Sequence, residues 1–305
     1  LYGVYLQDEW QLTRVLTVNY GLRYDISNGY NREDQLSPRL NFVYAVDSTT
    51  SLHGGYSRYF TPPALELISP TDIAQFQGTT NQLPSNSNTN VKAERDDYYD
   101  LGITHFLTPA WQMGLDTYYK NATNLLDEGQ FGQALVFSPF NYAHGRVWGI
   151  EYNTNYQIED FSSYLNLAYS RALGNDVISG QYNFDPAELA YISDHYVHLD
   201  HDQTWTASGG LAYEWEGTRY SLDGIFGSGL RAGFANTESL PSYAQFDVAV
   251  SQGMTLAGIG EIGVRLAIVN LFDRVYEIRN GTGIGVGAPQ YGPRRGFYLG
   301  LTKSF

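Results

Sequence analysis

The chain ends in the segment Arg294-Arg295-Gly296-Phe297-Tyr298-Leu299-Gly300-Leu301-Thr302-Lys303-Ser304-Phe305. Its large apolar residues mostly occupy alternate positions, and the positions between them hold small or polar residues and one tyrosine. Since successive side chains of a β-strand point to opposite faces, this pattern predicts a strand with one apolar face. A strand that ends on Phe305 is unusual for a soluble domain and is typical of the last strand of a membrane barrel.

The same alternation recurs along the chain. Between positions 16 and 24 every second residue is Leu, Val or Tyr, and the intervening residues are Thr, Asn, Gly and Arg. Similar patterns cover 111–120, 148–156 and 261–268, where Asp116, Glu151 and Arg265 fall on the less apolar parity. A water-filled or protein-filled lumen accepts such charges, whereas the packed interior of a soluble sandwich does not. The sequence therefore predicts an all-β, antiparallel, up-and-down transmembrane barrel.

Composition agrees with a barrel and excludes several other classes. The 305 residues are 15% aromatic, with 26 tyrosines, and only 16% charged, against about 25% in soluble domains. The absence of cysteine excludes a disulfide framework and thiolate chemistry. No apolar run of about 18 residues is present, which excludes a transmembrane helix. The net charge of -14 argues against a nucleic-acid partner.

Connectors between the predicted strands alternate in length. Short connectors are predicted at 11–14, 47–50, 108–110, 159–160, 216–218 and 252–260. Long connectors are predicted at 27–35, 61–93, 122–141, 172–202, 228–241 and 273–293. Alternating tight turns and long loops are typical of an outer-membrane barrel. They divide the chain into about thirteen strands, an odd number that cannot close an antiparallel barrel. Because Leu1 already lies within a strand pattern, we expect the missing part at the N-terminus.

Five stretches, in order along the chain, carry more specific motifs. They are Tyr5-Leu6-Gln7-Asp8-Glu9-Trp10, Gly55-Tyr56-Ser57-Arg58-Tyr59-Phe60-Thr61-Pro62-Pro63-Ala64-Leu65-Glu66, Val91-Lys92-Ala93-Glu94-Arg95-Asp96-Asp97-Tyr98-Tyr99-Asp100-Leu101-Gly102, Gly149-Ile150-Glu151 and Asn270-Leu271-Phe272-Asp273-Arg274-Val275-Tyr276-Glu277. With the terminal Phe305, they make the whole chain resemble the barrel of TonB-dependent outer-membrane receptors, although Ala93 stands where the family usually has proline. The resemblance makes Asn270, Leu271, Phe272, Tyr276 and Phe305 a barrel-assembly signature.

The resemblance implies an architecture and a set of partners. Residues 1–305 would form the C-terminal portion of a 22-stranded barrel, with no plug domain in this chain. The expected partners are the lipid bilayer and lipopolysaccharide, the barrel-assembly machinery, a small solute such as an iron chelate, and the TonB–ExbB–ExbD system acting through the missing plug. The expected location is the outer membrane of a Gram-negative bacterium. The implied function is active uptake of a scarce solute, with an iron–siderophore complex as the most common cargo.

Ligand-contact residues are predicted from position alone. They are the lumen residues Tyr59, Tyr118 and Arg265 and the loop residues Arg58, Phe60, Arg231 and Tyr291. Arg231, Arg279, Arg294 and Arg295 lie near the predicted outer rim, where guanidinium groups could bind an anionic substrate or lipopolysaccharide phosphates. No nucleophile-and-base grouping is found, so the chain is not expected to be an enzyme or to use a cofactor.

Other readings of the same residues remain open. His195, His198 and His201 lie beside aspartates and could bind a metal, but a polar outer loop is the simpler reading and no metal site is predicted. The glycine-rich segment 278–292 lacks the Lys-Ser/Thr ending of a phosphate loop and is predicted to be a mobile surface loop. A passive pore and a β-rich surface adhesin are the alternative functions. An adhesin would pack its aromatic faces together and would not need detergent.

Overall fold

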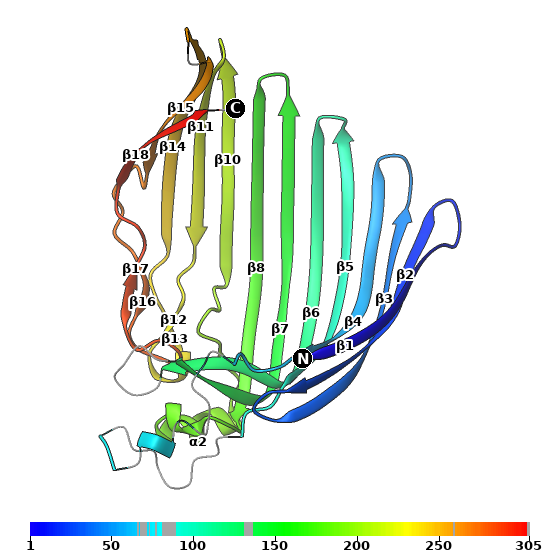
Figure 1. Cartoon of the computed structure of the whole chain (residues 1–305), viewed down its shortest axis with the longest axis vertical. Coiled ribbons are helices and arrows are strands. Elements are labelled where there is room, and N and C mark those ends of the chain that lie inside the picture. Colours follow the sequence, from blue (N-terminus) through cyan, green and yellow to red (C-terminus); the bar gives the residue numbers. More distant parts are fainter. Residues whose placement is uncertain are drawn as a thin grey trace.

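The protein folds into one large curved antiparallel sheet with loops gathered at one end, as the computed structural model in Figure 1 shows. The structure describes residues 1–65, 67, 72, 74–76, 78–80, 90–130, 137–258 and 260–303. Thirteen strands follow one another by hairpin connections in the order β1-β2-β3-β4-β5-β6-β7-β8-β10-β11-β14-β15-β18. The prediction of an all-β antiparallel fold with about thirteen strands is confirmed.

The strands of the large sheet have the following bounds: β1 (Tyr2–Gln11), β2 (Leu16–Asn28), β3 (Arg32–Ala45), β4 (Thr50–Thr61), β5 (Glu94–Thr108), β6 (Trp111–Gln130), β7 (Phe137–Ile158), β8 (Phe161–Val177), β10 (Trp205–Trp215), β11 (Thr218–Gly227), β14 (Tyr243–Leu256), β15 (Gly260–Val269) and β18 (Gly296–Lys303). Short elements fill the long connections: η1 (Ala74–Phe76), η2 (Gln181–Asn183), α2 (Pro186–Asp194), β9 (Val197–His198), β12 (Arg231–Ala232), η3 (Phe234–Asn236), β13 (Glu238–Ser239), β16 (Glu277–Asn280) and β17 (Pro289–Tyr291). Among the described residues, no helix is long and apolar enough to cross a membrane.

The sheet has two chemically different faces. Asn155 of β7, Tyr164 of β8 and Arg265 of β15 line one cavity although three other strands separate β8 from β15, so this parity faces the concave side. The opposite parity forms the convex face and exposes apolar residues such as Leu115 and Leu167. The alternation seen in the sequence therefore sorts polar side chains to the concave face and apolar ones to the convex face.

Aromatic side chains form two rows on the convex face. The row near the short turns contains Trp111, Tyr156, Phe161, Tyr213 and Tyr220, on consecutive strands from β6 to β11. The row near the long loops contains Tyr56, Tyr99, Tyr119, Trp148, Tyr169 and Trp205, from β4 to β10. From Trp111 to Tyr119 the distance along β6 is about 26 Å at roughly 3.3 Å per residue, comparable with the apolar band between the aromatic girdles of membrane barrels.

The prediction of long loops is wrong for two segments, which the structure shows mostly as paired strands. The segment 27–35 contains only a three-residue connection, 29–31, because β2 and β3 stay paired up to Asn28 and Arg32. The predicted loop at 122–141 is an extension of the β6–β7 hairpin, whose strands pair as far as Gln130 and Phe137. In both cases hairpin pairing continues through residues whose polar composition suggested a loop, since the strands run past the apolar band into polar surroundings.

The loop end of the sheet has a hydrophobic core of its own. This loop-end core consists of buried residues from the β6–β7 extension, β8 and the long connections: Ala122, Leu125, Phe140, Tyr142, Val177, Phe184, Ile192, Val197, Ala235 and Ile284. Helix α2 contributes Ile192, which is completely buried. The segment predicted to be a mobile glycine loop instead forms the β16–β17 hairpin and buries Ile284 in this core. The connections from β8 to β18 thus pack as a unit over one end of the sheet.

Candidate functional site

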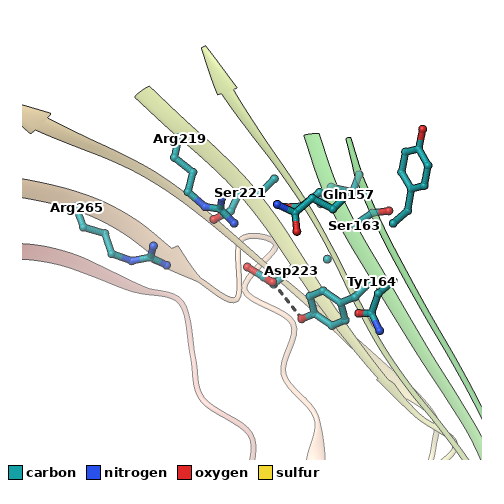
Figure 2. Close-up of a pocket in the computed structure, with 13 residues that line it drawn as sticks. Gln157, Ser163, Tyr164, Arg219, Ser221, Asp223 and Arg265 are labelled. Atoms are coloured by element: carbon teal, nitrogen blue, oxygen red, sulfur yellow. Dashed lines mark hydrogen bonds between the residues drawn. The ribbon is translucent and has the colours of Figure 1, made fainter. Parts of the chain in front are cut away.

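A polar pocket lies on the concave face near the turn end of the sheet, and Figure 2 shows it. Its volume is about 340 Å³, and its polar wall carries Tyr164, Arg219, Asp223 and Arg265. The phenol of Tyr164 donates a hydrogen bond to Asp223 Oδ1 at 3.2 Å. Arg265 was predicted as a ligand contact, and the structure places it in this pocket.

The chemistry of this pocket is that of binding. Two guanidinium groups, a carboxylate and the hydroxyls of the wall offer hydrogen bonds to a polar or anionic solute. Gly210 lies on β10 between Tyr164 and Asp223, and a side chain there would overlap the Tyr164 ring and Asp223 Oδ1. The glycine therefore leaves room for the Tyr164–Asp223 contact.

Three tyrosines form a second feature of the concave face, closer to the loop end. The ring centroids of Tyr59 and Tyr98 are 5.9 Å apart with an edge-to-face geometry, and those of Tyr98 and Tyr118 are 6.3 Å apart and stacked. Tyr59 and Tyr118 were both predicted as ligand contacts, and the structure joins them through Tyr98. Tyr98 itself was missed, although it has the same parity on β5 as Tyr118 has on β6.

Arg58 and Phe60 were predicted to be loop residues, and this placement is wrong. Both lie within β4, because its pairing with β5 continues to Thr61 and Glu94. They alternate with Tyr59, so they belong to the convex parity. The guanidinium of Arg95 lies 5.1 Å from the centre of the Phe60 ring. The predicted cluster of Arg58, Tyr59 and Phe60 is therefore divided between two faces of the sheet.

Arg231 and Tyr291 lie among the loop-end connections. The guanidinium of Arg231 is nearly buried, pairs with Asp202 at 3.3 Å and donates to Thr204 Oγ1 at 2.7 Å. Tyr291 of β17 is exposed and donates from its hydroxyl to Glu277 Oε1 at 2.9 Å. Arg231 thus holds two connections together, whereas Tyr291 is available at the surface. The seven predicted ligand contacts do not converge on one site.

The Asn270 motif has a clear structural role. Asn270 is fully buried with a left-handed backbone (φ 51°), and its side chain donates to the carbonyls of Arg274 and Pro293 at 2.9 and 2.8 Å. Its backbone N–H donates to Asp247 Oδ1 at 2.7 Å. The motif therefore fastens the end of β15 to β14 and to the residues that precede β18.

The other signature residues extend this fastening. Leu271 donates its N–H to the Phe246 carbonyl at 2.7 Å, and the exposed ring of Phe272 packs edge-on against Phe246. Tyr276 stacks on Tyr243 with 4.2 Å between ring centroids and donates to Gln245 Oε1 at 3.0 Å. Phe305 lies outside the described residues.

Hydrogen bonds at the start of the last loop affect Asp273. Its carboxylate accepts bonds from the Arg294 guanidinium at 2.8 and 2.6 Å and from the Arg295 N–H at 3.0 Å. These bonds, with that from Arg294 as the largest contribution, lower the pKa of Asp273 below its ordinary value. Arg294, which was considered for substrate or lipopolysaccharide binding, is thus paired within its own loop.

Several residues that organise the loop end were missed. Asn141 and Ser179 are buried, and the Asn141 side chain bonds both backbone polar groups of Lys92 at 2.8 and 2.9 Å. At the far end of the β6 extension, Gln130 N–H donates to the Gly285 carbonyl and the Gly287 N–H donates to Gln130 Oε1, both at 2.9 Å. Asn141, Ser179 and Gln130 are residue types that are common in loops, so the sequence contains no local signal for these long-range contacts.

One carboxylate oxygen in the same region has no hydrogen-bond partner among the described residues. Oδ2 of Asp127, in the β6 extension beyond the loop-end aromatic row, is enclosed and accepts no hydrogen bond from the described residues, although the residue as a whole is partly exposed. Burial raises the pKa of Asp127 to about 7, opposed by a hydrogen bond from the Glu128 N–H. The region therefore contains an acid that changes charge near neutral pH.

The three loop histidines do not converge. His198 bonds Asp202, the Nε2 atom of His201 lies 2.8 Å from an Arg279 nitrogen, and Nδ1 of His195 lies 2.9 Å from the Tyr191 carbonyl. Across the described part of the chain, no group of three or more His, Asp or Glu side chains is arranged to hold a metal ion.

Comparisons with known proteins place this geometry in context. The family described as "TonB dependent receptor-like, beta-barrel" matches residues 1–271. The ferric enterobactin receptor PirA of Pseudomonas aeruginosa is 26% identical over 99% of this chain and 41% of its own length. The ferric enterobactin receptor PfeA of Pseudomonas aeruginosa, in a mutant structure, has a TM-score of 0.69 at 17% identity over 99% of this chain and 44% of that chain. The FrpB iron transporter of Neisseria meningitidis has a TM-score of 0.67 at 16% identity, with 98% and 44% covered.

These matches bear on the fold and the class of protein. The chain spans less than half the length of PirA and of the two solved structures. The matched family and the named relatives are receptors and transporters, not enzymes. At this level of identity the solved structures show a shared barrel fold.

Proposed function

Because the chain belongs to the TonB-dependent receptor family, we propose that it is the barrel portion of a receptor that imports an iron–siderophore complex. The match over residues 1–271 supports the receptor class, and the similarity to PirA, a ferric enterobactin receptor, supports an iron chelate as cargo. The proposed location is the outer membrane of a Gram-negative bacterium, where the family's proteins reside. There the apolar convex face contacts lipid, and the loop end faces the outside.

The observation that carries the proposal is the arrangement of the concave face below the loop end. A solute that passes the loop-end core first meets the tyrosine row of Tyr59, Tyr98 and Tyr118. Aromatic faces and phenol hydroxyls suit a chelate with flat, polar ligand groups. Further toward the turn end, Arg219 and Arg265 offer charge to an anionic complex.

Energy coupling is the second part of the proposal. In the family, a plug domain fills the lumen and is pulled by TonB, which ExbB and ExbD energise. The charged and polar concave wall supports this arrangement, because a wall of Asp, Arg, Ser and Tyr side chains can hydrogen-bond to a protein domain inside the barrel.

Iron uptake tests the function directly. The intact protein that carries this chain is expressed in a host without other siderophore receptors, and uptake of radioactive iron is measured for ferric enterobactin and ferric citrate. We expect uptake of one chelate only, and no uptake when TonB is deleted. Uptake of many small solutes without TonB would instead establish a passive pore. Saturable binding to host cells without uptake would favour the adhesin.

Matched variants locate the binding wall. Arg265→Gln and Tyr98→Ala should each raise the chelate concentration needed for half-maximal uptake by about tenfold, as expected for loss of one charge-assisted or aromatic contact worth roughly 1.5 kcal/mol. Arg14→Gln is the control, since Arg14 is exposed in the short turn between β1 and β2 and lines neither pocket of the concave wall. If Arg14→Gln weakens uptake as much as Arg265→Gln, the concave wall is not the binding surface.

A further inference from the structure

The pairing between β3 and β4 ends before the two strands reach the loop end. Arg39 and Ser57 are the last opposed residues, and beyond them lie 32–38 of β3 and 58–61 of β4. Among the described residues, 58–61 pair with β5 alone and 32–38 with β2 alone. Pro38 is the first β3 residue past the last pair, and it has no backbone N–H to donate to β4. The sheet is therefore split here, and we call this split the β3–β4 opening.

The opening lies beyond the apolar band of the convex face. Tyr56 of the loop-end aromatic row is directly opposite Leu40 in the paired part of the two strands. The first β4 residue of the opening, Arg58, is two positions further, which is about 7 Å at roughly 3.3 Å per residue. Open sheet edges do not occur where they face hydrocarbon, because no water is there to hydrogen-bond to them. Beyond the band water reaches the edge, so the wall can open here.

A cavity of about 370 Å³ lies on the concave side of the opening. Ser37 and Arg39 line it from β3, and 57–60 line it from β4, so it spans the split. Tyr59 is one of these lining residues, and its ring centroid is 5.9 Å from that of Tyr98. The tyrosine row therefore begins at the inner end of the opening.

Three side chains close the opening, and we call them the clasp: Glu33, Gln35 and Arg95. Gln35 Nε2 donates across the split to the Tyr59 carbonyl at 2.7 Å, in place of a bond between the two backbones. Arg95 of β5 donates to Gln35 Oε1 and to the Asp34 carbonyl, both at 3.0 Å. The same guanidinium pairs with Glu33 at 3.3 Å. Side chains thus join β3 to β4 and β5 where the strand ladder does not.

The clasp can be released locally. The side chains of Arg95 and Glu33 are 25% and 17% exposed, so water can replace their partners when they separate. On either side of the opening, β2–β3 and β4–β5 stay paired by their own backbone bonds up to the loop end. At the outer end, the Tyr30 hydroxyl donates to the Ala64 carbonyl at 3.0 Å and holds the tip of β2–β3. Releasing the clasp therefore opens a window in the wall without breaking a ladder.

We propose that the β3–β4 opening is a side entrance, through which a solute reaches the concave face when the clasp releases. The loop-end core takes its residues from β6 onward, so the clasp can open while this core stays packed. Entry through the loop end itself would displace connections that share the core. A solute that passes the opening arrives at Tyr59 and hence at the tyrosine row. The identity of the solute, an iron chelate, rests on the proposed function, whereas the opening does not.

Thiol labelling tests the entrance without reference to transport. The intact protein in whole cells carries either Ser57→Cys, at the inner side of the opening, or Asn166→Cys, on the concave face of β8. Each reacts with a bulky maleimide that does not cross membranes. Adding Arg95→Gln should raise the labelling rate of Ser57→Cys at least tenfold and leave that of Asn166→Cys unchanged. An unchanged rate at Ser57→Cys, or an equal rise at both positions, overturns the proposal.

Cross-linking tests whether the solute uses the entrance. Gln35→Cys/Thr61→Cys places one thiol on each side of the opening, and this chain has no cysteine of its own. Ala45→Cys/Ser51→Cys is the control, because these residues are directly opposite each other in the paired part of β3 and β4. A short bis-methanethiosulfonate reagent bridges each pair, and a reductant removes the bridge. We expect the bridge across the opening to lower ferric enterobactin uptake at least tenfold, with recovery on reduction, and the control bridge to have no effect.

The two measurements separate this inference from the proposed function. Faster labelling in Arg95→Gln, in a protein that takes up no ferric chelate, would support the opening and contradict the iron function. Full uptake through a protein whose opening is bridged would contradict the side entrance and leave the iron function standing.

Discussion

Replacing Asn270 tests whether the loop motif is a structural fastening. Asn270→Ala removes three side-chain hydrogen bonds, to the carbonyls of Arg274 and Pro293 and from the Arg274 N–H, while the backbone bond to Asp247 can remain. The residue is fully buried, so water does not replace these partners in the folded state. Alanine must also adopt the left-handed conformation that Asn270 has at φ 51°.

The size of the loss follows from these contacts. Each hydrogen bond contributes roughly 1 kcal/mol net, so about 3 kcal/mol is lost with the side chain. Left-handed backbone costs alanine about 1–2 kcal/mol more, which gives a total of roughly 4–5 kcal/mol. Asn270→Gly loses the same hydrogen bonds but tolerates the backbone, so it should be about 1 kcal/mol less destabilising than alanine. The loss in Asn270→Gly therefore measures the side-chain hydrogen bonds, and the further loss in Asn270→Ala measures the cost of the left-handed backbone.

Urea unfolding of the intact protein in lipid vesicles measures these differences, with the folded fraction followed by the mobility of unheated samples in gels. Asn166→Ala is the control, because Asn166 is exposed on the concave face and makes one side-chain bond, to Ser208 at 3.1 Å. We expect less than about 1 kcal/mol for this control. If Asn270→Ala is also within 1 kcal/mol of the wild type, the fastening account is wrong. If glycine and alanine are equally destabilising, the backbone contribution is wrong.

Three further predictions concern the faces and the loop end. Leu167→Arg on the convex face should cost about 2–4 kcal/mol at the membrane midplane, and Ala168→Arg on the concave face far less; equal costs in vesicle unfolding would contradict the membrane assignment. Burial raises the pKa of Asp127 in the folded protein to about 7, whereas its pKa in the unfolded chain is 3.8. The folded state therefore holds a proton that the unfolded chain loses between these two values. This contribution to the free energy of unfolding is full below 3.8 and is lost as pH rises toward 7. The protection factor of the β6–β7 extension, which is the exchange rate corrected for its intrinsic pH dependence, should therefore fall between about pH 4 and 7, and it should not fall in Asp127→Asn. Arg231→Ala removes the guanidinium that pairs with buried Asp202 and leaves His198 as the remaining side-chain partner, so it should loosen the loop end by up to about 3 kcal/mol and increase exchange at β12; unchanged exchange would refute the pairing.

The segments that form strands, and the face to which each of their residues points, could be predicted because the alternation of apolar and polar residues is a local feature of the sequence. Parity along a strand depends only on which neighbours are apolar, so Tyr118 and Arg265 were assigned to the concave face correctly. Strand ends were less predictable, as 27–35 and the β6–β7 extension show. Beyond the apolar band a strand no longer needs an apolar face. The alternation of apolar and polar residues in the sequence therefore ends before the hydrogen-bonded pairing of the strands ends. Helix α2 had a local signal that was overlooked, since Asp185 and Pro186 occupy its first positions.

The candidate site was only partly predictable, because its residues are combined by long-range contacts. Arg231 was predicted as a ligand contact because it lies in an outer loop. Its partner Asp202 is 29 positions away in the sequence, and the residues around either one do not indicate that the two side chains pair. Arg279 and Asp200, 79 positions apart, are a further case. The sequence around a charged loop residue is the same whether its side chain binds a solute or a neighbouring loop. Only the arrangement of the loops decides between the two.

The same arrangement limits how the loop end can move. The β6 extension is bonded at Gln130 to the β16–β17 hairpin, and Asn236 of η3 bonds both the Ile284 N–H and the His198 carbonyl, each at 2.9 Å. These contacts join the connections that follow β6, β8, β11 and β15 around one apolar core, so displacing one connection exposes part of the core that the others share. Independent motion of each loop is therefore costly, and the connections between β6 and β18 should move together. Gln130→Ala removes the side-chain bond from the Gly287 N–H and leaves the backbone bond to the Gly285 carbonyl, so it should loosen the hairpin and change protection from hydrogen exchange equally at Ile192 and Ile284. A change confined to the β16–β17 segment would contradict this coupling.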